Sequence, residues 1–143
     1  MKRILAGAAM ALLTALPAAA QDERTLLSVI TSGEPQTQLM ALVLTMQSAT
    51  QGLAPRILLC GPAGDLALGD APASATAGQP PQDVSPQGLM RRLMENGARV
   101  EVCAIYLPGL GEDASVLIEG VGVADPAEIG ALIAAPDTRL FTN

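Results

Sequence analysis

Two cysteines, Cys60 and Cys103, are the side chains of this sequence best suited to chemistry. A thiolate is a nucleophile toward sulfur and a ligand for soft metals, so either residue could serve redox, sulfur-transfer or metal chemistry. The sequence contains no histidine. This removes the most common general base and metal ligand, and with them any Ser-His or Cys-His nucleophile pair. Catalysis by this chain would therefore depend on its thiols.

The first twenty residues have the organisation of a secretory signal peptide. Lys2 and Arg3 precede an apolar stretch at 4–16, and small residues at 18–20 come just before a polar segment. The apolar stretch is shorter than the roughly 20 residues that a bilayer-spanning helix needs. We therefore expect a cleaved signal peptide at 1–20, a single domain at 21–143, a periplasmic location and no membrane insertion after cleavage.

The expected mature chain is acidic and strongly apolar. Removing Lys2 and Arg3 leaves six arginines against fourteen acidic residues, a formal charge of −8. An acidic surface repels phosphate backbones, so nucleic acid is not an expected partner. Half of the residues are apolar, and such a chain can bury part of its exterior against copies of itself. We expect a homo-oligomer.

Short apolar runs alternate with helical patterns along the expected domain. Strands are expected at 25–31, 56–60, 99–107, 121–124 and 138–142, and helices from Pro35 up to Gln51, from Pro86 up to Asn96, at 112–119 and from Pro126 up to Pro136. This alternation predicts a three-layer α/β/α fold with a five-stranded, mainly parallel sheet. The flavodoxin-like strand order 2-1-3-4-5 would place a site at the carboxyl ends of strands one and three.

The long connection at 63–84 is rich in Ala, Gly and Pro, with at most one helical turn near 65–68. A connection of this length is either a functional cover or a mobile segment. It begins near the stretch Gly61-Pro62-Ala63-Gly64, which lacks the Lys-Ser/Thr ending of a phosphate-binding loop and the spacing of a dinucleotide fingerprint. The sequence therefore predicts no bound nucleotide or other cofactor.

The strand order 2-1-3-4-5 has a consequence for the cysteines. Cys60 would end strand two and Cys103 would lie in strand three, with strand one between them. Strands separated by a third lie about 10 Å apart, whereas a disulfide needs Cα atoms within about 7 Å. A disulfide is the ordinary expectation in an oxidising compartment, but this geometry predicts that one or both thiols are free. Cys103 could also be a buried small apolar residue in a strand.

Four other groups of polar residues have simpler explanations. Ser32, Gly33 and Glu34 follow the first strand, but a carboxylate at the start of a helix is explained by capping. Asp125 and Glu128 have the spacing of a capping box. Asp65 and Asp70 are expected to be solvated, and Arg91 and Arg92 to form an exposed helix face.

Four segments, ITSGEPQTQLMALVL, RILLCGPAGDLAL, SPQGLMRRLMENGARVEVCAIYLPGLG and LIEGVGVADPAEIGALI, resemble the DsrE/DsrF-like proteins of sulfur metabolism, in particular an exported branch of that family. The most specific part is the pattern formed by Gly97, Val100, Val102 and Cys103. The resemblance implies a sulfur carrier or sulfurtransferase-like protein that holds persulfide sulfur on Cys103, and a trimeric or hexameric assembly. It also implies a thiol-bearing protein as sulfur donor or acceptor.

Three hypotheses remain open at this stage. The first is a periplasmic sulfur carrier that uses Cys103, with Cys60 as a weaker candidate for a second thiol and residues 63–84 as a cover. The second is an oligomeric binding or scaffold protein without catalytic activity. The third is binding of copper(I) or zinc by both thiols, which their expected separation disfavours, so no metal site is predicted.

Overall fold

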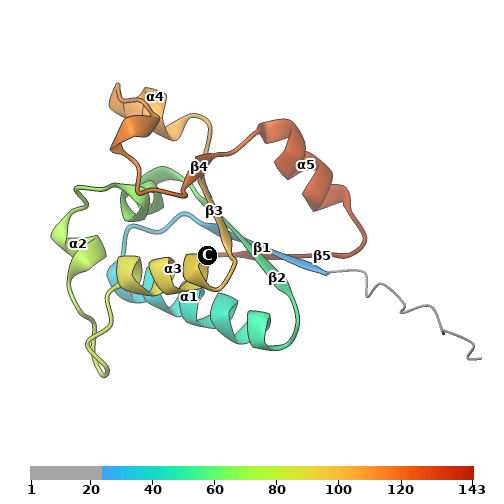
Figure 1. Ribbon diagram of the computed structural model, residues 1–143, viewed down its shortest axis with the longest axis horizontal. Coiled ribbons are helices and arrows are strands. Elements are labelled where there is room, and N and C mark those ends of the chain that lie inside the picture. Colours follow the sequence, from blue (N-terminus) through green and yellow to red (C-terminus); the bar gives the residue numbers. More distant parts are fainter. Residues whose placement is uncertain (1–23) are drawn as a thin grey trace, which may run out of the picture.

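The computed structural model describes residues 24–143, so the expected signal peptide at 1–20 lies outside the described residues. Helices and strands alternate along the chain (Figure 1). Their bounds are β1 (Thr25–Ile30), α1 (Pro35–Thr50), β2 (Ala54–Leu59), η1 (Gly61–Ala67), α2 (Ala73–Thr76), α3 (Pro86–Glu95), β3 (Arg99–Val102), α4 (Tyr106–Leu110), η2 (Ala114–Val116), β4 (Gly122–Val123), α5 (Pro126–Ala134) and β5 (Thr138–Thr142), where η1 and η2 are 3₁₀ turns.

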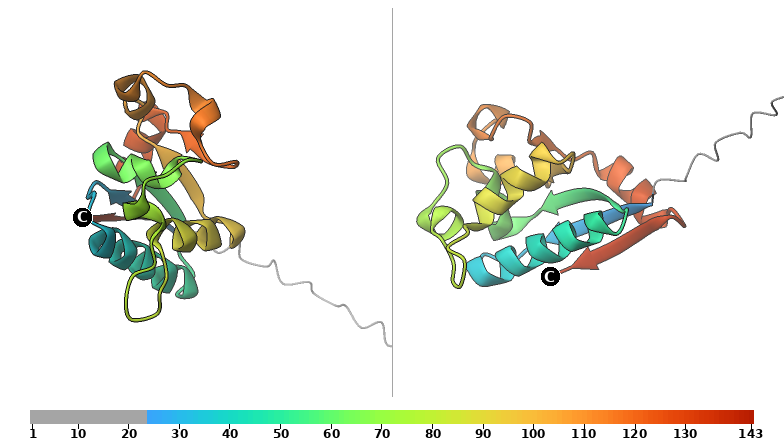
Figure 2. Two further views of the ribbon diagram at one scale, coloured as in Figure 1. Left: turned by 90° about the vertical axis from the view of Figure 1, so that its left-hand side faces the viewer. Right: turned by 60° about the horizontal axis from the view of Figure 1, so that its bottom comes forward.

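The strands form a single five-stranded sheet in the order β4-β3-β2-β1-β5, and all four neighbouring pairs are parallel. Helices α1 and α3 lie side by side against one face, and α5 packs on the opposite face (Figures 1 and 2). This arrangement confirms the expected three-layer α/β/α fold class with a parallel sheet.

The expected strand order 2-1-3-4-5 is wrong, because β2 lies between β1 and β3. Ile57, Leu58 and Leu59, the last three residues of β2, are all buried, which suits a central position. In β5, by contrast, Arg139 and Leu140 are exposed, as expected for a strand at the sheet edge. Alternation of strands and helices predicts right-handed crossovers but leaves the order of neighbouring strands open.

The third expected strand, 99–107, is more than twice as long as β3, which has four residues. β3 ends at Val102, and a turn closed by the Tyr106 N–H donating to the Cys103 carbonyl, at 2.9 Å, leads into the short helix α4. Tyr106 and Leu107 then fold back into the core. The expected helix at 112–119 is also wrong, since this segment contains only the short turn η2. A short apolar run does not distinguish a buried strand from a buried helix.

The helices that flank the sheet begin where the sequence predicts. Glu34 accepts hydrogen bonds from the N–H groups of Gln36 and Thr37 at the start of α1, at 3.0 and 2.6 Å. Hydrogen bonds from Thr37 and Gln36 lower the pKa of the Glu34 carboxyl. This confirms that Glu34 is a capping residue. Ser85 and Asp125 cap α3 and α5 in the same way.

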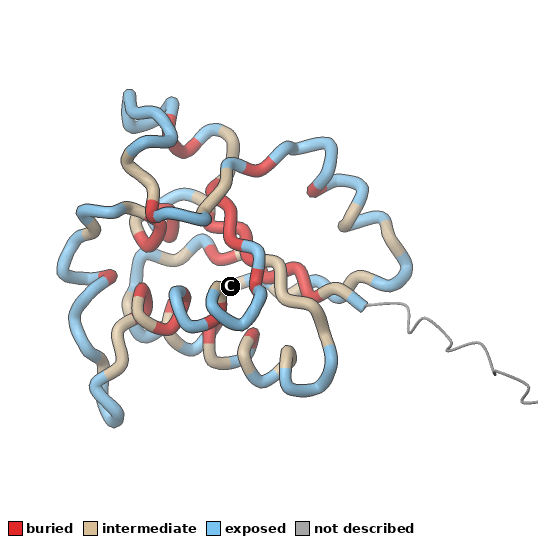
Figure 3. The backbone as a smooth tube through the Cα atoms, in the orientation of Figure 1, coloured by how far each residue is buried: buried red, intermediate tan, exposed pale blue. Residues whose placement is uncertain are grey.

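The two faces of the sheet carry cores of unequal size. The larger core lies under α1, α3 and η1, whereas the α5 side has four buried residues, Leu27, Leu58, Ala124 and Ile129. Figure 3 shows the buried positions concentrated in the strands and in the inner turns of the helices. Cys60 and Cys103 pack against the smaller core. The cysteines therefore lie on the more thinly covered face of the sheet.

The two ends of the connection at 63–84 lie in different surroundings, the first in the core and the second along a groove. Its first part belongs to η1, where Ala63, Leu66 and Ala67 are fully buried. Gln87 of α3 fastens this part by donating to the carbonyls of Leu66 and Leu68, both at 3.0 Å. Residues 79–82 and Val84 line a groove of about 560 Å³ together with α1 and α3. Neither cysteine lines this groove, and η1 is structural rather than a cover.

Tyr106 is anchored by a hydrogen bond from its hydroxyl to Asp65 Oδ1, at 2.7 Å. Asp65 was expected to be solvated, but the fold of α4 back onto η1 brings the phenol to it. Burial, reinforced by the hydrogen bond to Asp65, raises the pKa of Tyr106. A Cβ at Gly64 would collide with the Tyr106 ring. The close approach of η1 and α4 thus requires glycine at this position.

We predict that Gly64→Ala lowers the free energy of unfolding by about 1 to 3 kcal/mol, because the added methyl group must displace the buried Tyr106 ring. Urea denaturation followed by circular dichroism measures the change. Gly130→Ala in α5 is the matched control, since a Cβ there meets open space. It should stabilise the protein by about 0.5 to 1 kcal/mol through helix propensity. Equal effects of the two substitutions would contradict this account of Gly64.

Candidate functional site

Cys60 and Cys103 directly follow two neighbouring strands. The last register pair between β2 and β3 is Leu59 with Val102, so the cysteines are the next pair along the same two strands. The Cys60 N–H donates to the Ile30 carbonyl and the Cys103 N–H donates to the Leu59 carbonyl, both at 2.9 Å. The hydrogen-bond pattern of the sheet thus holds both backbones in place at its carboxyl edge.

The two side chains form a disulfide, with Cα atoms 5.1 Å apart and the two residues 43 positions apart in sequence. The Cα separation lies within the usual range for such bonds, about 4.4 to 6.8 Å. The expectation of free thiols is therefore wrong. It rested on β1 lying between the two cysteine-bearing strands, whereas β2 and β3 are direct neighbours.

The disulfide is only half buried. Both cysteines have intermediate exposure and contact the small core on the α5 side. Ile105, two residues after Cys103, is 82% exposed. Part of the surface of the disulfide-bonded pair is therefore exposed at the carboxyl edge of the sheet.

The end of β1 contributes backbone to the same edge. A Cβ at Gly33 would lie 2.8 Å from the Pro62 Cβ, so the loop after β1 and the start of η1 pass in close contact. Ser32 and Glu34 use their side chains locally: the Ser32 Oγ accepts from the Glu34 N–H at 3.1 Å, and Glu34 caps α1. The side chains of Ser32 and Glu34 are thus used in local contacts that shape this edge.

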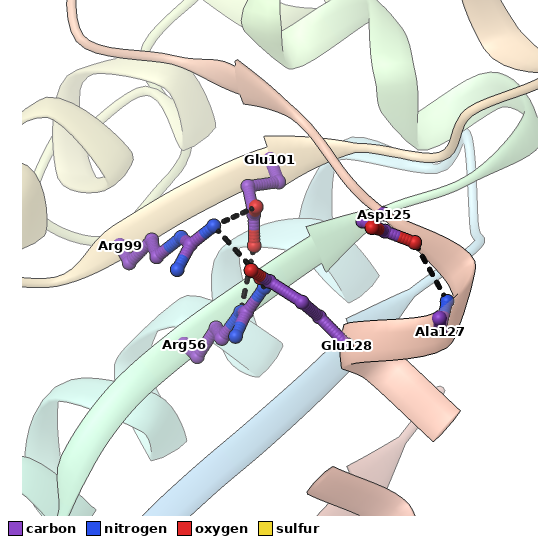
Figure 4. Close-up of polar contacts among 6 residues, drawn as sticks. All are labelled: Arg56, Arg99, Glu101, Asp125, Ala127 and Glu128. Carbon is purple, nitrogen blue, oxygen red and sulfur yellow. Dashed lines mark hydrogen bonds and ion pairs between the residues drawn. The ribbon is translucent and has the colours of Figure 1, made fainter. Parts of the chain in front are cut away.

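A cluster of four charged residues lies on the α5 face of the sheet (Figure 4). Glu101 of β3, which is 2% exposed, receives Arg56 Nε and Arg99 Nη2, each at 2.7 Å. Glu128 of α5 receives the same two arginines at 2.9 and 3.1 Å. The hydrogen bond from Arg56 and the charge of Arg99 lower the pKa of the Glu128 carboxyl.

This cluster corrects one expectation and adds residues that the sequence analysis missed. Asp125 caps α5 by accepting from the Ala127 N–H, but Glu128 turns to the arginines instead of completing a capping box. The sequence signal was a basic residue, Arg56, within the otherwise apolar β2 and an acidic one, Glu101, in β3. Linking Arg56 to Glu101 required knowing that β2 and β3 are neighbours.

The cluster shares its sheet face with the cysteines. Cys60 follows β2 four residues after Arg56, and Cys103 follows β3 two residues after Glu101, so each cysteine points to the same side as its charged neighbour. The two arginines are each bonded to two carboxylates. Their charge is thereby balanced inside the cluster. The ion pairs of the cluster link β2, β3 and α5 on the sheet face that carries the disulfide.

Within residues 24–143, no group of three or more Cys, Asp or Glu side chains is arranged to hold a metal ion. The two cysteines lie close together, so the expected distance between them no longer disfavours a two-thiol metal site. Both sulfurs, however, are bonded to each other in the disulfide. No helix in this part of the chain is long and apolar enough to span a bilayer.

Comparison with known proteins finds similar solved structures. No family model matches the sequence, and no curated protein matches it. Among solved structures, the chain is similar to MTH1491 from Methanobacterium thermoautotrophicum, described as a protein of unknown function, with a TM-score of 0.62 and 14% identity over 83% of this chain and 98% of that one. It is also similar to the ychN protein from E. coli, with a TM-score of 0.61 and 19% identity over 84% and 99% of the two chains.

The chain has a DsrE-like fold. The likeness extends over nearly the full length of both neighbours, so the fold is shared as a whole. At these identities the likeness concerns architecture, and the chemistry must be argued from the cysteines.

Proposed function

We propose that this protein is a periplasmic member of the DsrE/DsrF-like family that carries sulfur as a persulfide on Cys103. The observation that supports this most is the position of Cys103: it follows β3 at the carboxyl edge of a parallel sheet, where α/β folds place their sites, and it is half exposed. The resemblance of the sequence around Gly97 to Cys103 to that family points to the same residue.

The proposed reaction begins with the reduced protein, produced from the disulfide by a dithiol reductant. The Cys103 thiolate attacks the outer sulfur of a donor persulfide, the sulfur–sulfur bond of the donor breaks, and the donor leaves as a thiolate. Cys103 then carries the sulfane sulfur as a persulfide. An acceptor thiolate takes the outer sulfur in a second exchange of the same kind, which restores the Cys103 thiolate.

We also propose that the chain assembles with copies of itself, as a trimer or hexamer. Large apolar side chains are exposed on β4, α5 and β5, namely Val123, Ile133 and Leu140, and Ile105, two residues after Cys103, adds another. A second copy that covered them would remove apolar surface from water. Light scattering of the purified protein tests this, and a monomer at micromolar concentration would contradict it.

The test of the sulfur-carrier function is intact-mass spectrometry of the reduced protein after incubation with polysulfide. We predict that wild type gains a sulfur atom that a dithiol reductant removes again, and that Cys103→Ser gains none. Circular dichroism establishes that the variant is folded. Absence of any gain in the reduced wild type would reject the carrier function and favour a scaffold whose cysteines are structural.

A further inference from the structure

We infer that the disulfide form is itself a loading form, which captures hydrosulfide and converts it into a persulfide on Cys103. This inference rests on the proposed sulfur-carrier function and adds a substrate to it. The carrier would accept sulfane sulfur when its cysteines are reduced, and fully reduced inorganic sulfide when they are oxidised.

The step balances without an external oxidant. Hydrosulfide attacks the Cys103 Sγ, a new sulfur–sulfur bond forms, and the bond to the Cys60 Sγ breaks. Cys60 leaves as a thiolate and takes up a proton, while Cys103 becomes a persulfide. The hydrosulfide sulfur is oxidised by two electrons to the sulfane level, and the disulfide is the group that is reduced.

The backbone around the pair supports this role for Cys60. Ladder hydrogen bonds to Ile30 and Leu59 position the two cysteines, and both bonds involve main-chain atoms of the sheet, so they do not depend on the disulfide. Opening the bond therefore leaves the Cys60 thiol next to the persulfide. From there it can reverse the reaction by expelling hydrosulfide, which makes loading depend on the sulfide concentration.

The exposure of the pair suits a small nucleophile. Both cysteines are half buried, and they are packed on one side against the small core of the α5 face. Hydrosulfide is the smallest thiol-type nucleophile, so it needs less open space at the bond than a peptide thiol does. The partial cover thus favours hydrosulfide over bulky thiols such as a cysteine-containing tripeptide.

The experiment treats the protein, purified in its disulfide form after expression of the full chain, with a concentration series of sodium sulfide in the absence of oxygen. Samples are quenched at successive times with a thiol-alkylating reagent and analysed by intact mass. Cyanide treatment of parallel samples, which releases sulfane sulfur as thiocyanate, provides the second readout. We expect wild type to gain up to one sulfur atom per chain, with two alkylated positions and a matching yield of thiocyanate.

Cys60→Ser is the matched control, because it keeps Cys103 but cannot form the disulfide. It should gain no sulfur from sulfide and should still gain sulfur from polysulfide. Any sulfur that this variant gains from the sulfide solution comes from polysulfide in the reagent, so the variant also measures that contamination. The same series with a tripeptide thiol in place of sulfide should open the disulfide of wild type at least several-fold more slowly.

The outcomes separate the two proposals. If polysulfide loads the reduced wild type but sulfide leaves the disulfide intact, or opens it without retained sulfur, the inference is overturned and the carrier function stands. Equal loading of wild type and Cys60→Ser by sulfide would also overturn it. If neither protein gains sulfur even from polysulfide, the carrier function fails, and this inference fails with it.

Discussion

Replacing Glu101 with glutamine is expected to lower the free energy of unfolding by about 3 to 5 kcal/mol, the usual cost of removing one partner from a buried ion pair. Glu101 is 2% exposed and receives both Arg56 and Arg99, and Arg56 is itself only 11% exposed. In Glu101→Gln, the Arg56 guanidinium would lose its buried counter-charge and keep only Glu128 at the protein surface. Urea denaturation at neutral pH measures the loss.

Two further variants show whether the charge of Glu101 is responsible. Glu128→Gln removes the exposed carboxylate of the same cluster and should destabilise the protein less than Glu101→Gln. The double variant Arg56→Met with Glu101→Leu removes both buried charges at similar volume, and such replacements are often neutral or stabilising. It should recover most of the stability. Equal denaturation midpoints for wild type and Glu101→Gln would contradict the assigned role.

Reduction of the disulfide is expected to lower the free energy of unfolding by about 2 to 4 kcal/mol, because the bond restricts the unfolded chain across its closed loop. The loop joins residues 43 positions apart and contains η1, α2, α3 and β3. We nevertheless expect the reduced protein to stay folded, since its cores lie on both sheet faces and a domain usually has about 5 to 15 kcal/mol of stability.

Urea denaturation with and without a dithiol reductant measures this difference. The double variant Cys60→Ser with Cys103→Ser is the control, because its midpoint should be the same under both conditions. A wild-type midpoint that the reductant does not change would show that the bond is absent in solution or does not stabilise the fold. Loss of all structure on reduction would contradict the first step of the proposed reaction, which needs a folded dithiol.

Local patterns in the sequence predicted most of the elements and the fold class. Proline after a capping residue marked the starts of α1, α3 and α5, and short apolar runs marked β1 and β2. The end of β3 was not predictable in this way. Residues 103–107 are apolar whether they continue a strand or turn into α4, and only the packing of Tyr106 on Gly64 and Asp65 decides between the two.

The site was predicted in its residues but not in its arrangement. Cys103 stood out by its type and by its strand position, and its role as a sulfur carrier stays a prediction. The pairing with Cys60 depended on which strands are neighbours, a property of the whole sheet that no local spacing encodes. The contact of Arg56 with Glu101 was missed for the same reason, because it also depends on β2 and β3 being neighbours. One wrong strand order thus accounts for both the missed disulfide and the missed ion cluster.

The most direct test of the central claim, that Cys103 carries the sulfur, is to locate the added sulfur on the chain. Cleavage after arginine separates the cysteines, because Cys60 falls in the peptide 57–91 and Cys103 in the peptide 100–139. The reduced protein is treated with polysulfide, alkylated, digested and analysed by tandem mass spectrometry. We predict the alkylated persulfide on Cys103. Sulfur found on Cys60 alone, or on neither cysteine, would contradict the claim.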